Sequence, residues 1–241
     1  TPSWVCNAQN NLIDNAWFGK ENIFNFEEIV DGKKTWKLNA DKVTFSDGKT
    51  WKNYVRDTRL EITCGEAPYL VSRYDTTTGE FIVIENRIGL LDRKLRVINE
   101  NVDDTGKWLE AAQMAYKNIY AFEWQGDSLL LAREAMLITF IENYRLKFNK
   151  EPLLKSLLYI AYIISWNVWQ MDGLKGVIPN SCSIKSSETL DLFGGIERKD
   201  MNCDGCGKNL IHKHNGEYAL IKDWSNTDIV TGKKGRKIKF V

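Results

Sequence analysis

The sequence predicts an α/β protein with a mainly parallel sheet and helices on both faces of that sheet. Three short apolar segments favour this class, because each reads as a buried strand that ends on small or polar residues, at 60–62, 118–124 and 167–170. Segments with apolar residues at helical spacing lie between them. In such a sheet a ligand binds outside the carboxyl ends of the strands. We therefore expect functional residues at these strand ends.

Length and charge limit the class of protein. The chain has 241 residues, of which 43% are apolar and 27% charged, the profile of a soluble globular protein with one large domain or two small ones. A net charge of +1 gives no overall attraction to nucleic acid. Basic residues gather at 233–239, which favours a solvated edge, with a phosphate-contacting patch as the alternative. No apolar run reaches the ~18 residues that a membrane span needs.

The two ends and the cysteines add further expectations. The chain begins at Thr1 without a methionine and stops within the apolar pair Phe240-Val241, so we expect a fragment of a longer protein. Five cysteines, an odd number, are widely spaced except for Cys203 and Cys206. This usage is typical of a reduced, cytoplasmic protein rather than of a disulfide framework.

The first third of the chain predicts one helix, a loop-rich insertion and the first strand. The helix follows Pro2 and continues to Trp17. Residues 19–55 are polar and aromatic, with turn signals at Asp31-Gly32 and Asp47-Gly48, and predict irregular structure with one hairpin. The strand at residues 60–62 then leads into a helix over 69–74, because Pro68 suits the first turn of a helix.

The later elements follow the same alternation. Apolar spacing predicts helices over the segments 87–98, 105–117, 128–144 and 152–161. Between them, the strand at 118–124 ends on Glu123, and the third strand is followed by the turn Asp172-Gly173. A carboxylate at the second strand end suits a ribose diol, and one at the third suits an exocyclic amine. The alternatives are a solvent-facing glutamate and an ordinary turn.

Taken in order, these segments resemble the cofactor half of an S-adenosylmethionine-dependent DNA methyltransferase that acts on the adenine amino group, the kind associated with restriction-modification systems. Thr1-Pro2-Ser3-Trp4 is similar to the family's opening Thr-Pro segment. Residues 60–70 resemble its Leu-Glu-Pro-Ser-Cys-Gly-Glu-Gly motif, 120–124 with Ala132-Arg133 its second motif, and 167–174 its third. The resemblance covers residues 1–174 and implies a Rossmann-like methyltransferase fold.

The resemblance also implies residue roles. Thr1 and Pro2 would lie near the methionine part of the cofactor, Glu61 would hold its ammonium group, and the second and third motifs would hold its ribose and adenine. The cofactor contacts implied in full are Thr1, Pro2, Glu61, Thr63, Cys64, Gly65, Glu66, Ala67, Glu123, Trp124, Asp172, Gly173 and Leu174. In the complete protein the target amine would attack the methyl group in line, with DNA as the partner.

Two departures from the family pattern matter. Ala67 stands where the family has a glycine that lets the methionine moiety approach the backbone. The catalytic Asn-Pro-Pro-Tyr motif, which holds the flipped adenine, is absent from this chain, so no catalytic residue is assigned. We therefore expect this chain to bind cofactor without turning over. Residues 1–177 form the expected cofactor domain, and 178–241 contain a Cys/His module and the start of a further strand.

The Cys/His module centres on a Cys-x-x-C pair at Cys203 and Cys206. A structural zinc ion needs four ligands, and the candidates are Cys203, Cys206, His212, His214 and Cys182. If the histidines lie in a strand, the spacing His-x-His puts both rings on one face. The alternative is a metal-free glycine-rich turn. Two rival functions stay open: a zinc-knuckle DNA-binding or specificity module without methyl transfer, and another nucleotide-binding enzyme, weakened by the missing Gly-x-Gly-x-x-Gly.

Overall fold

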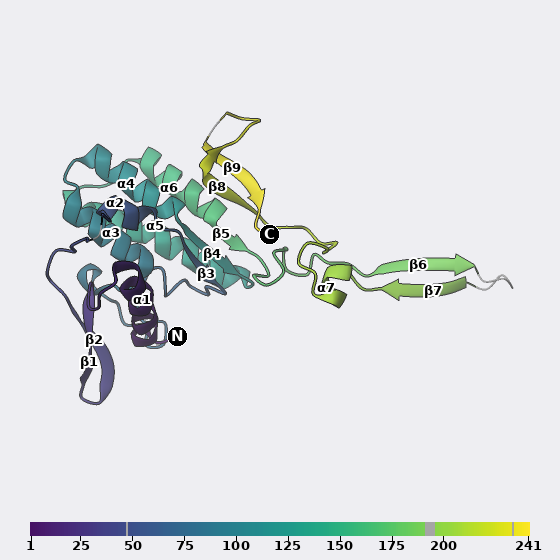
Figure 1. Ribbon diagram of the computed structural model, residues 1–241, viewed down its shortest axis with the longest axis horizontal. Coiled ribbons are helices and arrows are strands. Elements are labelled where there is room, and N and C mark those ends of the chain that lie inside the picture. Colours follow the sequence, from purple (N-terminus) through teal and green to yellow (C-terminus); the bar gives the residue numbers. More distant parts are fainter. Residues whose placement is uncertain (47, 191–195, 233) are drawn as a thin grey trace.

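The computed structural model describes residues 1–46, 48–190, 196–232 and 234–241. A body of helices and a small sheet carries a long two-stranded arm at one end (Figure 1). The elements in chain order are α1 (Ser3–Phe18), β1 (Asn25–Val30), β2 (Lys33–Leu38), α2 (Trp51–Arg56), β3 (Arg59–Ile62), η1 (Ile84–Asn86), α3 (Leu90–Asn101), α4 (Thr105–Lys117), β4 (Ile119–Glu123), α5 (Gly126–Phe148), α6 (Leu154–Asn167), β5 (Val168–Gln170), β6 (Lys185–Leu190), β7 (Ile196–Met201), α7 (Asp204–Lys208), β8 (Leu220–Thr227) and β9 (Lys234–Lys239).

The predicted parallel sheet is present as three strands in the order β3-β4-β5. Ile62 pairs with Phe122, and Glu123 pairs with Gln170, so the carboxyl ends of the strands meet at one edge. The chain passes from β3 to β4 through α3 and α4, and from β4 to β5 through α5 and α6. The structure therefore confirms a mixed α/β fold with strands at the predicted places.

Helices cover one face of this sheet. Ile119 and Ala121 of β4 belong to the large core that contains the apolar residues of α3, α4, α5 and α6. Tyr120 and Phe122 face the opposite way, where the C-terminal hairpin covers them and Phe240 lies 4.5 Å from Phe122 between ring centroids. Both crossovers run in the same direction, and right-handed crossovers then place their helices on one face. In the described part of the chain, the expectation of helices on both faces is wrong.

The first strand of the sheet is less buried than its apolar composition predicts. Leu60 is 44% exposed and Ile62 is 42% exposed. Both alternate with Glu61 onto the face opposite the helices, and β3 lies at the edge of the described sheet. The sequence pattern identified the strand correctly. It does not specify how deeply Leu60 and Ile62 are buried, because that depends on which segment packs against them.

The predicted helix over residues 69–74 is wrong. Ala67 adopts a φ of 60°, and the N–H groups of Leu70 and Val71 both donate to its carbonyl, which makes a single turn. The chain then leaves the helical path because the Ser72 N–H donates to Oδ2 of Asp92 at 2.8 Å. This bond to the first turn of α3 replaces the next bond within a helix. Pro68 therefore lies in a turn.

The insertion before the sheet contains the predicted hairpin. β1 and β2 pair antiparallel, and the turn between them holds Asp31 and Gly32 at positive φ, as a tight hairpin turn requires. α1 is fixed to the body by a buried ion pair in which Arg93 Nη1 lies 2.6 Å from Asp14 Oδ2. Both side chains are 1% exposed, so this pair helps to hold α1 against α3.

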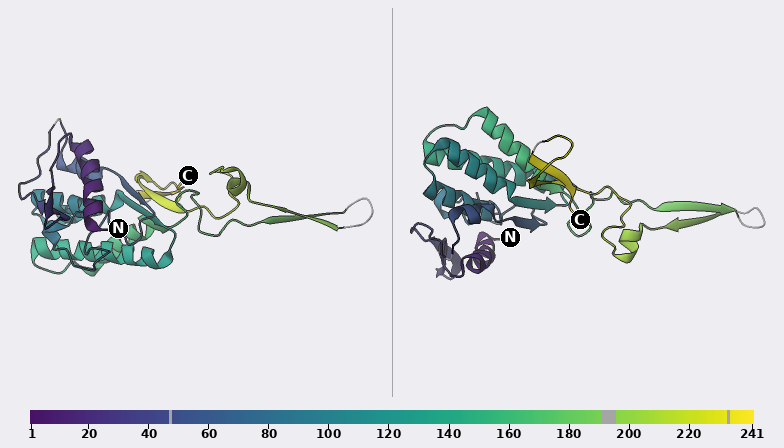
Figure 2. Two further views of the ribbon diagram at one scale, coloured as in Figure 1. Left: turned by 90° about the horizontal axis from the view of Figure 1, so that it is seen from below. Right: turned by 45° about the horizontal axis from the view of Figure 1, so that its top comes forward.

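The last part of the chain makes a small Cys/His unit, a projecting arm and a returning hairpin. β6 and β7 form the arm, which extends away from the body in Figures 1 and 2. β8 and β9 pair antiparallel and pack back onto the sheet through Ile221 and Phe240. The strand expected near the end of the chain is therefore the second strand of this hairpin. Within the described ranges, no helix combines the length and apolarity needed to cross a bilayer.

Candidate functional site

A cavity of about 300 Å³ opens at the carboxyl end of β3. Its floor is the turn that follows the strand, and its sides come from the N-terminus of the chain and the first turn of α5. The lining residues are Thr1, Glu61, Thr63, Cys64, Gly65, Glu66, Pro68, Tyr69, Thr76 and Ser128. A cavity of this size lies at the lower end of the ~300–1,000 Å³ typical of ligand sites. We call it the strand-end cavity.

The turn that lines this cavity has an unusual backbone. Thr63, Gly65 and Ala67 have φ values of 59°, 54° and 60°, in the left-handed region. A β-branched residue such as Thr63 rarely adopts this conformation, because it costs residues other than glycine roughly 1–2 kcal/mol. The Cys64 N–H continues the ladder of the sheet by donating to the Phe122 carbonyl at 2.9 Å. Such strain persists where surrounding contacts hold it, and it is common at binding sites.

Glu123 holds this turn from the neighbouring strand. Its Oε2 accepts the N–H of Gly65 at 2.6 Å, and its Oε1 accepts the N–H groups of Trp124 and Gln125 at 2.8 and 2.9 Å. The side chain is 8% exposed and does not line the strand-end cavity. The structure therefore places Glu123 beside the predicted cofactor turn, with its carboxylate already bound to three backbone groups.

Glu61 is one of two glutamates that line the cavity, the other being Glu66. Burial, and after it the negative charge of Glu123, raise the pKa of Glu61 from 4.5 to about 9, so the side chain is protonated near neutral pH. Its Oε2 atom is buried and has no hydrogen-bond partner among the described residues. A buried polar atom without a partner is costly. A ligand that donates a hydrogen bond here, above all a cation, would relieve that cost.

The N-terminus of the chain reaches the cavity through α1. The carboxylate of Asp75 accepts the Ser3 N–H at 2.7 Å and the hydroxyl and N–H groups of Thr77. Burial opposes ionisation of Asp75, but these hydrogen bonds, led by that of the Thr77 hydroxyl, lower its pKa. The Thr76 hydroxyl donates to the Thr1 carbonyl at 2.8 Å. Together these bonds hold Thr1 in the lining of the strand-end cavity.

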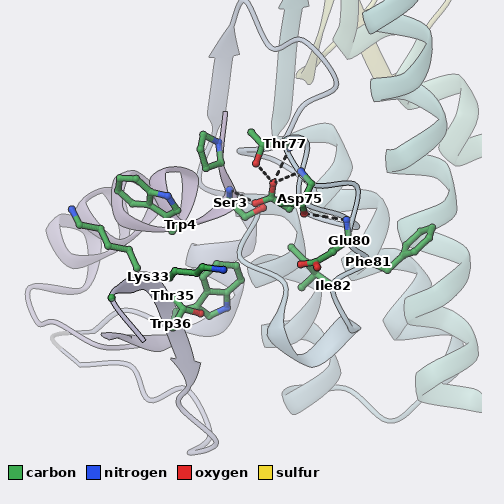
Figure 3. Close-up of a pocket in the computed structure, with 14 residues that line it drawn as sticks. Ser3, Trp4, Lys33, Thr35, Trp36, Asp75, Thr77, Glu80, Phe81 and Ile82 are labelled. Atoms are coloured by element: carbon green, nitrogen blue, oxygen red, sulfur yellow. Dashed lines mark hydrogen bonds between the residues drawn. The ribbon is translucent and has the colours of Figure 1, made fainter. Parts of the chain in front are cut away.

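Pro2 points instead to a second and larger cavity of about 790 Å³. Figure 3 shows this cavity between the start of α1, the hairpin β1–β2 and the segment that carries Asp75 and Phe81. The Lys34 ammonium lies 4.6 Å from the centre of the Trp4 ring on its rim. Asp75 in this lining is already hydrogen-bonded to the backbone. The other large or charged lining residues are Trp4, Trp36, Phe81, Lys33, Lys34 and Glu80.

The third predicted segment makes a turn beside β3. Asp172 Oδ1 accepts the N–H groups of Leu174 and Lys175 at 3.1 and 3.2 Å, and the Lys175 ammonium lies 3.4 Å from Oδ2. Gly173 packs against Ile62, where a Cβ would collide with the Ile62 side chain. The segment therefore lies at the predicted edge of the sheet, but its carboxylate caps its own turn.

The predicted cofactor residues divide into two groups. Those that line the strand-end cavity are Thr1, Glu61, Thr63, Cys64, Gly65 and Glu66, whereas Pro2, Ala67, Glu123, Trp124, Asp172, Gly173 and Leu174 do not. Sequence reasoning missed Pro68, Tyr69, Thr76 and Ser128 as lining residues. The position of Ser128 at the start of a helix after a strand was a usable signal, since such positions face a ligand in doubly wound sheets. Thr76 has no such signal in the sequence, because only tertiary contacts bring it to the cavity.

A second site lies in the C-terminal part, where Cys182, Cys203, Cys206 and His214 meet. Their ligand atoms all lie within 4.8 Å of one another, and no other group of this kind was found among the described residues. The three sulfur atoms lie 3.5, 3.7 and 3.6 Å from Nδ1 of His214. Ligands of a tetrahedral zinc ion, with bonds of ~2.3 Å to sulfur and ~2.0 Å to nitrogen, stand about 3.6 Å apart. This group could hold a metal ion.

Close backbone packing supports this arrangement. A Cβ at Gly205 would lie 2.6 Å from the His214 ring, and one at Gly216 would lie 2.9 Å from the sulfur of Cys182. The Asn215 N–H donates to the Cys203 sulfur at 3.3 Å. Burial opposes ionisation of this thiol, but hydrogen bonds led by that N–H lower its pKa to about 6. The donor set and the glycine cradle therefore fit a metal held by thiolates.

His212 does not belong to this group. It is exposed and lies in a turn, so the expectation that a strand would place both histidine rings on one face is wrong. The turn is held by Tyr218, whose hydroxyl accepts the His214 N–H at 2.9 Å and donates to the Ile211 carbonyl. Cys182 is the fourth member of the group and precedes β6 in the chain, whereas Cys203 follows β7.

Comparisons with protein-family models, with characterised proteins and with solved structures found no match to this chain. The class of protein is therefore described by its own fold and sites. It is an α/β protein with a short parallel sheet, a cavity at the carboxyl edge of that sheet and a Cys₃His group that could bind a metal ion.

Proposed function

We propose that the strand-end cavity binds S-adenosylmethionine and that the chain is the cofactor part of a DNA adenine methyltransferase of a restriction-modification system. The observation that carries the proposal is Glu61, which lines the cavity together with Thr1 and the strained turn at Thr63 and has one buried carboxyl oxygen without a hydrogen-bond partner among the described residues. Ligands of this fold class bind at that edge of the sheet. DNA is the proposed partner, and the cytoplasm, where thiols stay reduced, is the proposed location.

The chemistry of the cavity suits this ligand. The Glu61 carboxyl would accept hydrogen bonds from the ammonium group of the cofactor, and the turn from Thr63 to Glu66 would lie against its methionine part. Bound S-adenosylmethionine supplies an electrophilic methyl group. Glu123 supports the turn through Gly65 and reaches a ribose only if that bond lengthens, so its main contribution is positioning. The rest of the rate would come from orienting the target amine.

Isothermal titration calorimetry with S-adenosylmethionine tests the proposal. A cation beside Glu61 favours the ionised carboxylate, so binding near neutral pH should release a proton and the measured heat should differ between buffers of different ionisation enthalpy. Glu61→Gln should weaken binding and remove the buffer dependence contributed by this residue. Glu110→Gln, on the exposed side of α4, is the matched control. Absence of heat from the folded wild-type protein at high concentration contradicts the proposal.

We also propose that the Cys₃His group holds a structural zinc ion. Four protein ligands leave no open position, which is typical of structural rather than catalytic zinc. Zinc content measured by mass spectrometry after purification should be one ion per chain, as one Cys₃His group implies. His214→Ala should lose that ion, whereas His212→Ala should keep it, because only His214 lies in the group. Equal zinc content in both variants, or none in the wild type, contradicts this assignment.

The closed ligand set favours one alternative function, a zinc-knuckle DNA-binding or specificity module without methyl transfer. The group joins the two ends of the β6–β7 arm, which projects from the body as a recognition element could (Figure 2). This alternative expects salt-dependent DNA binding that needs zinc and no response to S-adenosylmethionine. The calorimetric titration separates the two functions.

A further inference from the structure

Aromatic rings line the outer side of α6 and continue onto β5 and β8. Tyr159 and Tyr162 are 36% and 43% exposed, and their rings stack with centroids 6.3 Å apart and planes at 21°. Trp166 and Trp169 stack in the same way at 6.1 Å and 10°. Trp224 of β8 meets Tyr162 edge to face at 6.1 Å. Figure 1 shows the hairpin β8–β9 beside α6, which is where Trp224 and Tyr162 meet.

Lysines are interleaved with these rings. The Lys117 ammonium lies 5.2 Å from the centre of the Tyr159 ring and 5.5 Å from that of Trp224. The Lys237 ammonium lies 5.0 Å from the centre of the Trp166 ring. We define the aromatic–lysine surface as Tyr159, Tyr162, Trp166, Trp169, Trp224, Lys117, Lys222 and Lys237.

Lys222 fixes the geometry of the surface. Its ammonium donates a hydrogen bond to the Tyr162 hydroxyl and lies 5.0 Å from the centre of the Trp166 ring and 5.2 Å from that of Trp224. The side chain is only 7% exposed. Lys222 therefore joins β8 to α6 and holds the rings in place, while the lysines at either end remain accessible.

The surface carries positive charge without acidic partners. α6 contains no aspartate or glutamate, and β9 contains Lys234, Arg236, Lys237 and Lys239 and no acid. None of these basic groups, nor Lys117 or Lys222, forms an ion pair within the ranges that the structure describes. The nearby Asp223 is bound by Ser225 and Asn226 of its own turn. Unpaired cations beside exposed rings suit a partner that is both anionic and aromatic.

We propose that the aromatic–lysine surface binds single-stranded nucleic acid, with bases stacked on the exposed tyrosine rings and phosphates held by Lys117 and Lys237. Stacking on aromatic side chains needs unpaired bases, which a duplex does not offer. The abundance of positive charge opposes a second copy of the same surface as the occupant. The inference goes beyond the proposed methyltransferase function and does not depend on it, because none of these residues lines the strand-end cavity.

Fluorescence anisotropy with a labelled oligothymidylate of about 20 nucleotides, longer than the ~4–16 that a compact domain covers, tests the inference. The wild-type chain should bind it with an affinity that falls as salt rises, and a duplex of equal length should bind about tenfold more weakly because its bases are not available for stacking. Equal affinity for the duplex overturns the proposal, as does self-association in size-exclusion chromatography that covers this surface.

Variants separate stacking from charge. Tyr159→Ala should weaken binding about tenfold without changing its salt dependence, since a base stacked on one ring contributes on that scale. Replacing Lys117 and Lys237 together by glutamine should reduce the slope of log K against log salt by about 1.4, because each phosphate that a lysine neutralises on a single strand contributes ~0.7 to that slope. Phe81→Ala, at a ring that is 78% exposed elsewhere, and Lys33→Gln are the matched controls.

If the two controls weaken binding as much as the surface variants, the binding is not localised to this surface and the proposal fails. The calorimetric response to S-adenosylmethionine should be the same in Tyr159→Ala and in the wild type. If the chain binds cofactor but not nucleic acid, only the nucleic-acid proposal fails. If it binds nucleic acid but not cofactor, only the cofactor proposal fails.

Discussion

The Gly65 N–H donates to Oε2 of Glu123 at 2.6 Å, across 58 residues of sequence. This bond joins the turn after β3 to the end of β4, and the other carboxylate oxygen accepts the two N–H groups that follow β4. One side chain therefore organises two of the three strand ends at the edge where the strand-end cavity lies. The conformation of the turn that lines the cavity therefore depends on a residue of the neighbouring strand.

Replacement of Glu123 tests this dependence. Glu123→Ala should lower the free energy of unfolding by about 3 kcal/mol, because three partly buried backbone N–H groups lose a charged acceptor. Urea unfolding followed by circular dichroism measures the change. Glu110→Ala on the exposed side of α4 should stay within about 0.5 kcal/mol of the wild type. Equal effects of the two substitutions would show that the bonds to Glu123 contribute little.

The raised pKa of Glu61 predicts a pH-dependent stability. The folded protein holds the proton up to about pH 9, whereas the unfolded chain releases it near 4.5, so this residue's contribution is fully present below pH 4.5 and is lost as the pH rises toward 9. Glu61→Gln cannot ionise and should make the free energy of unfolding fall less steeply across this range. Thermal unfolding at a series of pH values measures the slope, and parallel curves for the two proteins contradict the assignment.

The left-handed backbone at Thr63 predicts a stabilising substitution. Thr63→Gly should raise the free energy of unfolding by roughly 0.5–1 kcal/mol, since relief of ~1–2 kcal/mol of strain exceeds the entropy gained by the unfolded chain. Thr58→Gly, at a residue without positive φ, should destabilise and serves as the control. The difference between the two denaturation midpoints is the measurement. A loss of stability at Thr63 equal to that at Thr58 would mean that the conformation is not strained.

Removal of metal should affect the two parts of the chain differently. The proposed zinc joins Cys182 to Cys203 and His214, whereas the large core of α3, α4, α5 and α6 contains none of these residues. A chelator should therefore increase amide hydrogen exchange around α7 and the base of the β6–β7 arm while leaving exchange in α5 unchanged. Added zinc should restore protection. Uniform loss of protection across α5 would show that the ion supports the whole chain.

The order of elements was predictable because it depends on local periodicity. Apolar spacing located α4, α5 and α6 and the three strands, and a Cys-x-x-Cys pair with a later histidine located Cys203, Cys206 and His214, three members of the group that could bind a metal ion. Local patterns failed at Pro68, where a hydrogen bond from Ser72 to Asp92 redirects the chain. They also failed at Leu60, whose exposure depends on which segment covers the second face of the sheet.

By itself the sequence determined that two strands carry Glu61 and Glu123 toward one edge of an α/β fold, because strand spacing and residue type are local properties. Only the tertiary structure decided what those carboxylates do. Glu123 is bound by three backbone N–H groups, whereas one buried carboxyl oxygen of Glu61, which lines the cavity, has no partner among the described residues. Hydrogen bonding and burial join residues distant in sequence, so they determine protonation and access, which the order of residues does not specify.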